Sequence, residues 1–521
     1  MTESQKALEI REKLARWQAS KEAVRPLDDA TALKKLHAAR LSDEEIEEKL
    51  GRLSIQGSPA SPRVLASYAD LHALDRLDEA NQGIDLSDNR PAANQRAILQ
   101  AAEIALLTTR DLAQRATRDI NAGNLGEAEE KYRWISALQR TLTSLGDVAS
   151  KHAVRGNGTD VSISDSVNAG HCLEDLRTMH RAMQNAGLTD EGHISHRDLH
   201  DPARNLSHQA FVDTTYIDLW NKSLQRVRLP GVEKGDGESK EAFYRRIIGT
   251  DALHLAVNEL DQKGDNFLRQ FRAYHQMSEV LVAQVNQCIA ETITKLLDHN
   301  IPISEAREQV RMTLSLLDVV NENIEPILNN LSVNKYQEIR GSLGITSGSH
   351  SPNIRGGLFD PLYELLVHAA ELRVMDLHDY TSPALHDRLH EIMEPPRVDE
   401  KTQQYRELLR DVHDVHLHLR KWRDLHMQFV RTQIGQSPIH ETPTASISGA
   451  RDALKSATGM RKRAHGSSDP MKAIHEAVTG QPFQPEPRES LAIPFADAML
   501  GNTARVVTER SSGVQQRVAE R

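Results

Sequence analysis

Apolar residues recur at the three- and four-residue spacing of amphipathic helices along most of this chain, from about residue 65 onward. Alternating β-branched runs are scarce, while Ala, Leu, Glu, Arg and Gln dominate, and these residues favour helices. The charged stretch at residues 1–55 predicts further amphipathic helices, one of them capped by Ser42. The pattern therefore predicts an all-α multi-helix bundle. Its breaks fall at residues 57–62, 156–166, 229–240, 341–357 and 393–401.

One stretch, residues 414–449, predicts a helix that ends at Gly435, followed by a loop of small hydroxyl residues. The apolar positions near helical spacing are Leu417, Leu425, Phe429 and Ile434. His426 lies inside this helix, one turn after Trp422. Taken alone, such a histidine is most simply a satisfied, partly buried residue.

Three segments recur in the same order and predict a duplicated helical unit. The pairs are 68–77 with 250–260, 96–103 with 272–279, and 126–134 with 304–312. The middle pair, RAILQAAE and RAYHQMSE, shares Arg, Ala, Gln and Glu in one register. The first copy has Leu99 where the second has His275, so only the second copy carries this polar group.

Composition narrows the class of protein. The 521 residues include 64 Lys and Arg against 74 Asp and Glu, a net charge of -10 that does not favour nucleic acid. Two cysteines allow at most one disulfide, which argues against a secreted disulfide scaffold. The N-terminus lacks the apolar core of a signal peptide, and no window approaches 18 uncharged apolar residues. We therefore expect a soluble cytoplasmic protein that binds neither nucleic acid nor membrane.

Four motifs follow one another in the second half of the chain. A helix contributes His275, Gln276 and Glu279. A loop contributes Ile339, Arg340 and Leu343, then Ser347, Gly348, Ser351 and Arg355. A second helix contributes Trp422, Arg423, His426, Val430, Ile434 and Gly435, and a last loop contributes Thr444, Ser448 and Gly449. In order and spacing, residues 250–455 resemble the tryptophan 2,3-dioxygenase superfamily of haem-dependent aromatic oxygenases.

The resemblance implies a role for each motif. His426 would be the proximal ligand of the iron of haem b, with Trp422 beside the cofactor. His275 would be the distal catalytic residue, hydrogen-bonded to an indole N–H or a phenolic oxygen. Arg355 would hold a substrate carboxylate by a bidentate pair. The remaining substrate-binding residues would be Thr444, His350 and Ser347.

The chain departs from the family in its loops. The glycines of the last loop are replaced around Thr444 by Pro443 and residues 445–447, and an aromatic-Gln pair is replaced by Ser349 and His350. These changes resemble the divergent branch that contains monodechloroaminopyrrolnitrin synthase. The expected function is oxidation of an indole-like or other aromatic amino-acid-derived substrate with O2 or peroxide, by a dioxygenase or monooxygenase, in specialised metabolism.

The repeat and the resemblance together predict four parts of the chain. They are an N-terminal helical extension (1–60), a helical copy without a haem ligand (61–235), a haem-binding catalytic domain (236–455) and a C-terminal extension that is partly loop or mobile (456–521). Whether the chain forms a homo-oligomer stays open.

Two other functions compete with the oxygenase. A non-enzymatic helical scaffold, or a haem-binding protein without turnover, would use the duplicated helices as an interaction surface. A metal hydrolase would use histidine clusters instead, because two histidines four residues apart on a helix can chelate a metal. The candidate clusters are His413, His416 and His418; His386 and His390; and residues 193–200.

Overall fold

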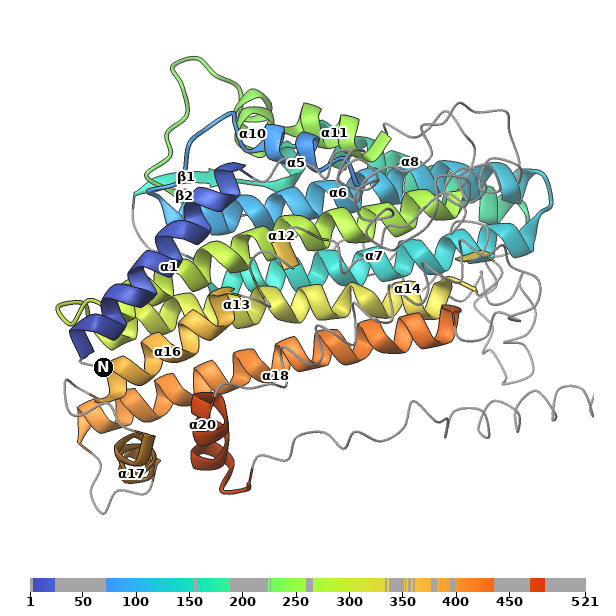
Figure 1. Cartoon of the computed structure of the whole chain (residues 1–521). Helices are drawn as coiled ribbons and strands as arrows, with labels where there is room; N and C mark the ends of the chain where they lie inside the picture. The colour runs from blue at the N-terminus through green and yellow to red at the C-terminus, as the bar shows by residue number, and fades with distance from the viewer. Residues whose placement is uncertain are drawn as a thin grey trace, which may run out of the picture.

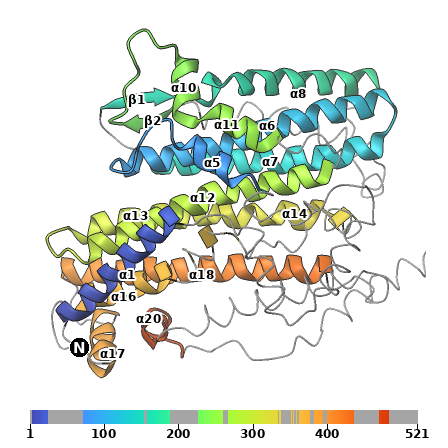
Figure 2. The same cartoon turned by 45° about the horizontal axis from the view of Figure 1, so that its top comes forward.

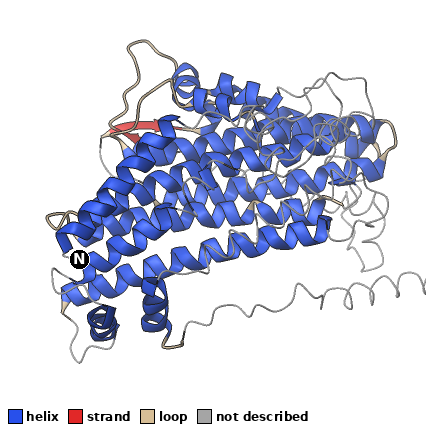
Figure 3. Cartoon of the chain, viewed as in Figure 1, coloured by secondary structure: helices blue, strands red, loops and turns tan. Residues whose placement is uncertain are grey.

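The structure is a computed structural model in which long helices lie side by side as a bundle (Figure 1). It describes residues 3–23, 72–153, 157–187, 224, 226–258, 266–332, 335–336, 351, 353–354, 358, 361–375, 382–393, 399–434 and 469–482. Nearly all regular structure in these ranges is helical (Figure 3). The all-α prediction is confirmed.

Two sets of three helices follow the order of the predicted repeat. The first set is α5 (Leu74–Ala80), α6 (Arg90–Asn121) and α7 (Leu125–Lys151); the second is α11 (Thr250–Asn258), α12 (Asn266–Leu296) and α13 (Ile303–Glu322). Within each set the two long helices pack together, and α6 packs on α12 at the centre of the bundle (Figure 2). One apolar core runs through both sets. The proposed division at residue 235 stays a prediction.

The other helices surround this centre. They are α1 (Glu3–Ala23), α8 (Val167–Asn185), α10 (Lys240–Ile248), α14 (Ile324–Asn330), α16 (Pro361–Met375), α17 (Ser382–Met393), α18 (Glu400–Ile434) and α20 (Asp469–Thr479). Helix α8 packs on α6, α16 on α12, and α18 on α13, while α20 lies against α17 and α18. The candidate ligand helix α18 is therefore placed against the second set.

Two of the predicted breaks contain short strands that the sequence pattern did not predict. Strand β1 (Gly158–Val161) pairs antiparallel with β2 (Val227–Pro230), and a 3₁₀ turn (Ile163–Asp165) follows β1. A Cβ atom at Gly158 would lie 2.5 Å from the carbonyl oxygen of Leu229, so the strands approach this closely only with glycine there. The pair sits at one end of α6 and connects the two repeats.

Helix α18 ends at Ile434, as Gly435 predicted. It begins at Glu400, well before the predicted stretch at residues 414–449. Its buried apolar residues are Tyr405, Leu408, Leu409, Val412, Val415, Leu419, Trp422 and Phe429. The prediction that Leu417 lies on this face is wrong, because Leu417 is 41% exposed. It follows Val415 by two residues, about 200° around the helix, and so points the other way.

Two further expectations concern the described residues. Cys172 and Cys288 are both buried, free thiols, so the disulfide that the count allowed does not form between them. No described helix combines the length and the apolar character that a membrane span requires.

Candidate functional site

The structure describes three of the predicted site residues. His275 lies on α12, and Trp422 and His426 lie on α18. The predicted substrate-binding residues Arg355, Thr444, His350 and Ser347 lie outside the described residues. The site is therefore built here from the two helices that carry the histidines.

His275, which lies near His426, packs on one group of aromatic rings, here named the aromatic cluster: Phe271, Tyr336 and Phe429. The ring of Phe271 lies 4.2 Å from that of His275 and 6.3 Å from that of Phe429, measured between centroids. Phe429 follows His426 by three residues and so lies on the next turn of the same face. Tyr336 packs edge-on against Phe429 at 5.1 Å. Two histidines that are far apart in sequence thus share one apolar environment.

The imidazole of His426 is held flat against an indole. Its ring lies 5.0 Å from that of Trp422 with an interplanar angle of 6°. Its Nδ1 atom is buried and has no hydrogen-bond partner within the part of the chain that the structure describes. Burial, and then the nearby His275, lower the pKa of His426 to about 4. The ring is therefore neutral near pH 7, which is the form that ligates a metal.

His275 has a defined tautomer. Its Nδ1 lies 2.8 Å from the carbonyl oxygen of Phe271, one turn earlier on α12. A carbonyl can only accept, so Nδ1 carries the proton and Nε2 keeps a lone pair. Burial lowers the pKa of His275 to about 4, against the opposing effect of this hydrogen bond. The residue presents a neutral acceptor at Nε2.

The other two residues of the His-Gln-x-x-Glu motif hold neighbouring segments in place. Gln276 donates to the carbonyl oxygens of His72, at 3.0 Å, and of Ala256, at 2.9 Å. Glu279 accepts a hydrogen bond of 2.9 Å from Nδ2 of Asn353. Asn353 is thereby held against α12.

The first copy contains the same polar pair without a histidine. Glu103, at the repeat position of Glu279, is fully buried and accepts from Nδ2 of Asn168 at 2.7 Å. Ser166 and Tyr244 also donate to its carboxylate, each at 2.9 Å. Burial raises the pKa of Glu103, while these three donors act in the opposite direction. Leu99, at the repeat position of His275, is fully buried.

Sequence reasoning missed four neighbours of the histidines. They are His72, whose ring stacks on His275 at 4.7 Å, and the three aromatic rings of the cluster. The one sequence signal was the Leu-His pair that recurs in segments 68–77 and 250–260. This recurring pair indicated a repeat, but it did not indicate that His72, and not His254, packs on His275.

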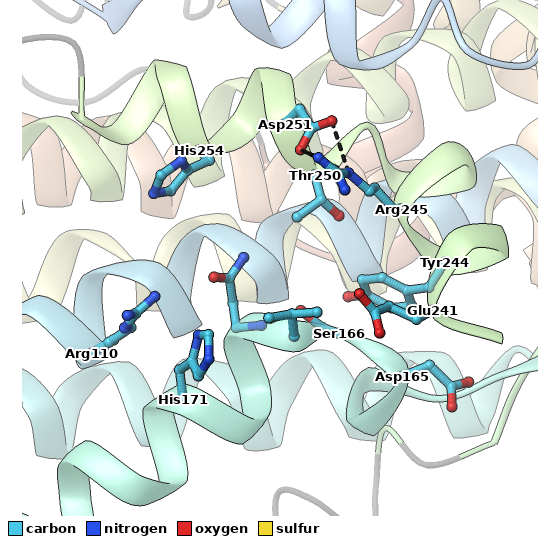
Figure 4. Close-up of a pocket in the computed structure, with 12 residues that line it drawn as sticks. Arg110, Asp165, Ser166, His171, Glu241, Tyr244, Arg245, Thr250, Asp251 and His254 are labelled. Carbon is cyan, nitrogen blue, oxygen red and sulfur yellow. Dashed lines mark hydrogen bonds and ion pairs between the residues drawn. The ribbon is translucent and has the colours of Figure 1, made fainter. Parts of the chain in front are cut away.

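A separate pocket of about 310 Å³ lies between α6 and α8 of the first copy and α10 and α11 of the second (Figure 4). Its lining includes Arg110, His171 and His254 on one side and Glu241 and Asp251 on the other. It shares no lining residue with the aromatic cluster. Its acidic residue Asp251 is already paired with Arg245 at 2.7 Å, so we place the candidate site at the two neutral histidines.

The histidines of α18 that suggested a metal site have separate partners. His413 Nε2 lies 3.0 Å from His475 Nδ1, His416 Nδ1 lies 2.8 Å from the hydroxyl of Tyr363, and His418 Nε2 lies 2.9 Å from Asp318 Oδ1. The described ranges contain no group of three or more His, Cys, Asp or Glu side chains placed to hold a metal ion. Haem iron requires only one protein ligand, so this observation does not bear on haem. Side chains of His386 and of residues 193–200 lie outside the described residues.

Comparison with known proteins adds no assignment. No protein-family model matches the chain, and no curated protein matches it significantly.

Proposed function

We propose that this protein is a haem-dependent oxygenase acting on an indole-like or other aromatic amino-acid-derived substrate. The observation that carries the proposal is the proximity of His275 and His426, which come from separate helices: His275 acts on the pKa of His426, and Phe271 beside His275 packs against Phe429, one turn after His426. Both imidazoles are neutral, since burial lowers each pKa to about 4. One neutral imidazole is suited to ligating iron and the other to accepting a hydrogen bond.

His426 fits the role of the iron ligand. Its buried Nδ1 has no hydrogen-bond partner among the described residues, and the parallel Trp422 ring restrains its plane. A buried ring nitrogen without a partner is costly, so a further group that satisfies this imidazole would stabilise it. Bound haem would supply the activation of O2 or peroxide, while the protein supplies ligation, orientation and exclusion of water.

The role we propose for His275 is orientation of the substrate. Because Nδ1–H is donated to the carbonyl oxygen of Phe271, Nε2 is the ring nitrogen that carries a lone pair and is suited to accept from an indole N–H. The adjacent rings Phe271 and Phe429 offer apolar faces for an aromatic substrate. The family resemblance adds Arg355 and Thr444 as groups that would bind the carboxylate and ammonium of an amino acid. Whether one or two oxygen atoms are inserted is left open by this proposal.

An optical spectrum tests the proposal. Protein expressed with added haem should show a Soret band, and His426→Ala should remove it or reduce it strongly. His418→Ala is the matched control, because His418 lies on the same helix but faces Asp318. Indole added to the haem-loaded protein should shift the band.

Two outcomes would overturn the proposal. A folded protein without a Soret band would leave the helical scaffold as the better interpretation. Equal haem content in the His426→Ala and His418→Ala proteins would exclude His426 as the iron ligand.

A further inference from the structure

A second histidine, His72, packs directly on the ring of His275. The two imidazoles are stacked, with 4.7 Å between centroids and 13° between planes. His72 is only 1% exposed. The ring of Phe271 is tilted against the same imidazole, and the carbonyl oxygen of Phe271 accepts the hydrogen bond from its Nδ1. His275 is therefore restrained by His72, which is nearly parallel to it, and by Phe271.

The backbone around His72 is held firmly. The side-chain amide of Gln276, the residue after His275, donates to the carbonyl oxygen of His72, so the backbone at His72 is held against α12. Ala73 adopts a left-handed conformation, with φ 50° and ψ 47°, and is 1% exposed. It is the one non-glycine residue with positive φ in the part of the chain that is described. Such a conformation costs about 1–2 kcal/mol for an L-residue and persists where the surroundings impose it.

His72 comes from the first copy, whereas His275 belongs to the second. The paired glutamines of the two segments both donate to backbone carbonyls of the other segment's side of the bundle, though not at matching positions: Gln276 donates to His72, and Gln100 donates to Ile248 at 3.2 Å. His72 of the first copy thus packs on His275 of the second copy. The first copy itself has Leu99 at the position equivalent to His275.

We propose that His72 is a positioning residue, supplied by the first copy, that fixes the plane of the His275 ring for substrate binding. This inference rests on the proposed function, because it assigns His275 the orienting role. A flat ring stacked at van der Waals distance limits rotation of its neighbour, and an aliphatic side chain of similar volume does not define a plane. The first copy would then be part of the site and more than a structural support.

Two variants of similar size separate stacking from packing. His72→Phe keeps a flat ring, and His72→Leu keeps bulk without one. His254→Leu is the matched control, because His254 occupies the repeat position of His72 but is exposed. All three should fold, as judged by circular dichroism, because none leaves a large cavity at residue 72.

The first readout requires no haem. Nitrogen-15 NMR of the histidine side chains, with His275 assigned by a His275→Asn variant, reports the tautomer and ring environment of His275. Wild type, His72→Phe and His254→Leu should show the Nδ1–H tautomer, whereas His72→Leu should show tautomer averaging. Charged or titratable groups facing the pair include Arg272 and His426, so the pH profile of the signal is recorded in each variant.

The second readout is the affinity of the haem-loaded protein for indole, followed at the Soret band. His72→Leu should weaken it about tenfold or more, and His72→Phe should restore most of it, since small misplacements at a site are costly. If both variants match wild type, or if both lose affinity equally while His275 keeps its tautomer, the positioning role is wrong. A missing Soret band with the expected NMR pattern would instead defeat the oxygenase proposal and leave the stacking intact.

Discussion

Acidification should weaken the packing of α20 on α18 through one histidine pair. His413 on α18 is 3% exposed, and its Nε2 lies 3.0 Å from Nδ1 of His475 on α20. One nitrogen must donate and the other accept, so the hydrogen bond is lost once both rings are protonated. Burial, followed by the neighbouring His475, lowers the pKa of His413 to about 4, and burial also lowers that of His475.

The size of the effect follows from this difference in pKa. An unfolded histidine has a pKa near 6.5, so the pKa of His413 lies about 2.5 below it, and at about 1.4 kcal/mol for each pH unit the upper bound is about 3.5 kcal/mol. Since the folded pKa is the lower one, the unfolded chain binds more protons between these values. The stabilisation is therefore complete above about pH 6.5 and decreases as the pH falls toward 4.

Urea unfolding, followed by circular dichroism at several pH values between about 7.5 and 5, measures this slope. The free energy of unfolding of wild type should fall by up to about 1.4 kcal/mol per pH unit more steeply than that of His413→Gln. His418→Gln is the control of opposite sign, because the hydrogen bond that His418 donates to the Asp318 carboxylate raises the pKa of His418. The stabilisation from His418 is present at low pH and is lost as the pH rises. Equal slopes for wild type and His413→Gln would refute the argument.

Four further substitutions test the site and its supports. His275→Ala should keep the Soret band but lose the optical response to indole, because the Nε2 acceptor is removed; an unchanged indole titration would contradict the assigned role. Ala73→Gly should raise the free energy of unfolding in urea by up to about 1 kcal/mol, since glycine adopts positive φ without strain. Asn168→Leu and Asn353→Leu should each lower it by about 1–3 kcal/mol, because each removes a donor to a buried carboxylate. Only Asn353→Leu should also alter the affinity for indole, because Glu279 lies one turn after His275. An equal change in affinity in Asn168→Leu would contradict the placement of the indole site at His275.

Local patterns predicted the helices well. Helical spacing and composition gave the all-α class, and Gly435 located the end of α18 at Ile434. The same reasoning misplaced Leu417, because four apolar residues near helical spacing were assigned to one face before the buried face of the whole helix was known. It also missed β1 and β2, since four-residue strands at the predicted breaks are too short to show a clear alternation.

The site was predictable only in part. The order of motifs singled out His275 and His426, and the structure brings both to the aromatic cluster. His72 could not be found in this way, because its contact depends on how the first copy packs against the second. The left-handed conformation at Ala73 has no sequence marker either, since alanine is an unusual residue there and glycine or asparagine is the common one.

The two copies separate the structural part of the His-Gln-x-x-Glu motif from its chemical part. Glu103 and Glu279 each accept from an asparagine amide, although the first copy has Leu99 in place of His275. The glutamate pairing therefore does not depend on the candidate site, and its role is to satisfy a buried carboxylate and hold a neighbouring segment against a central helix. What the first copy adds to the site is instead the stacked ring of His72. We therefore expect the segment with Leu99 to support the histidine of the other through His72.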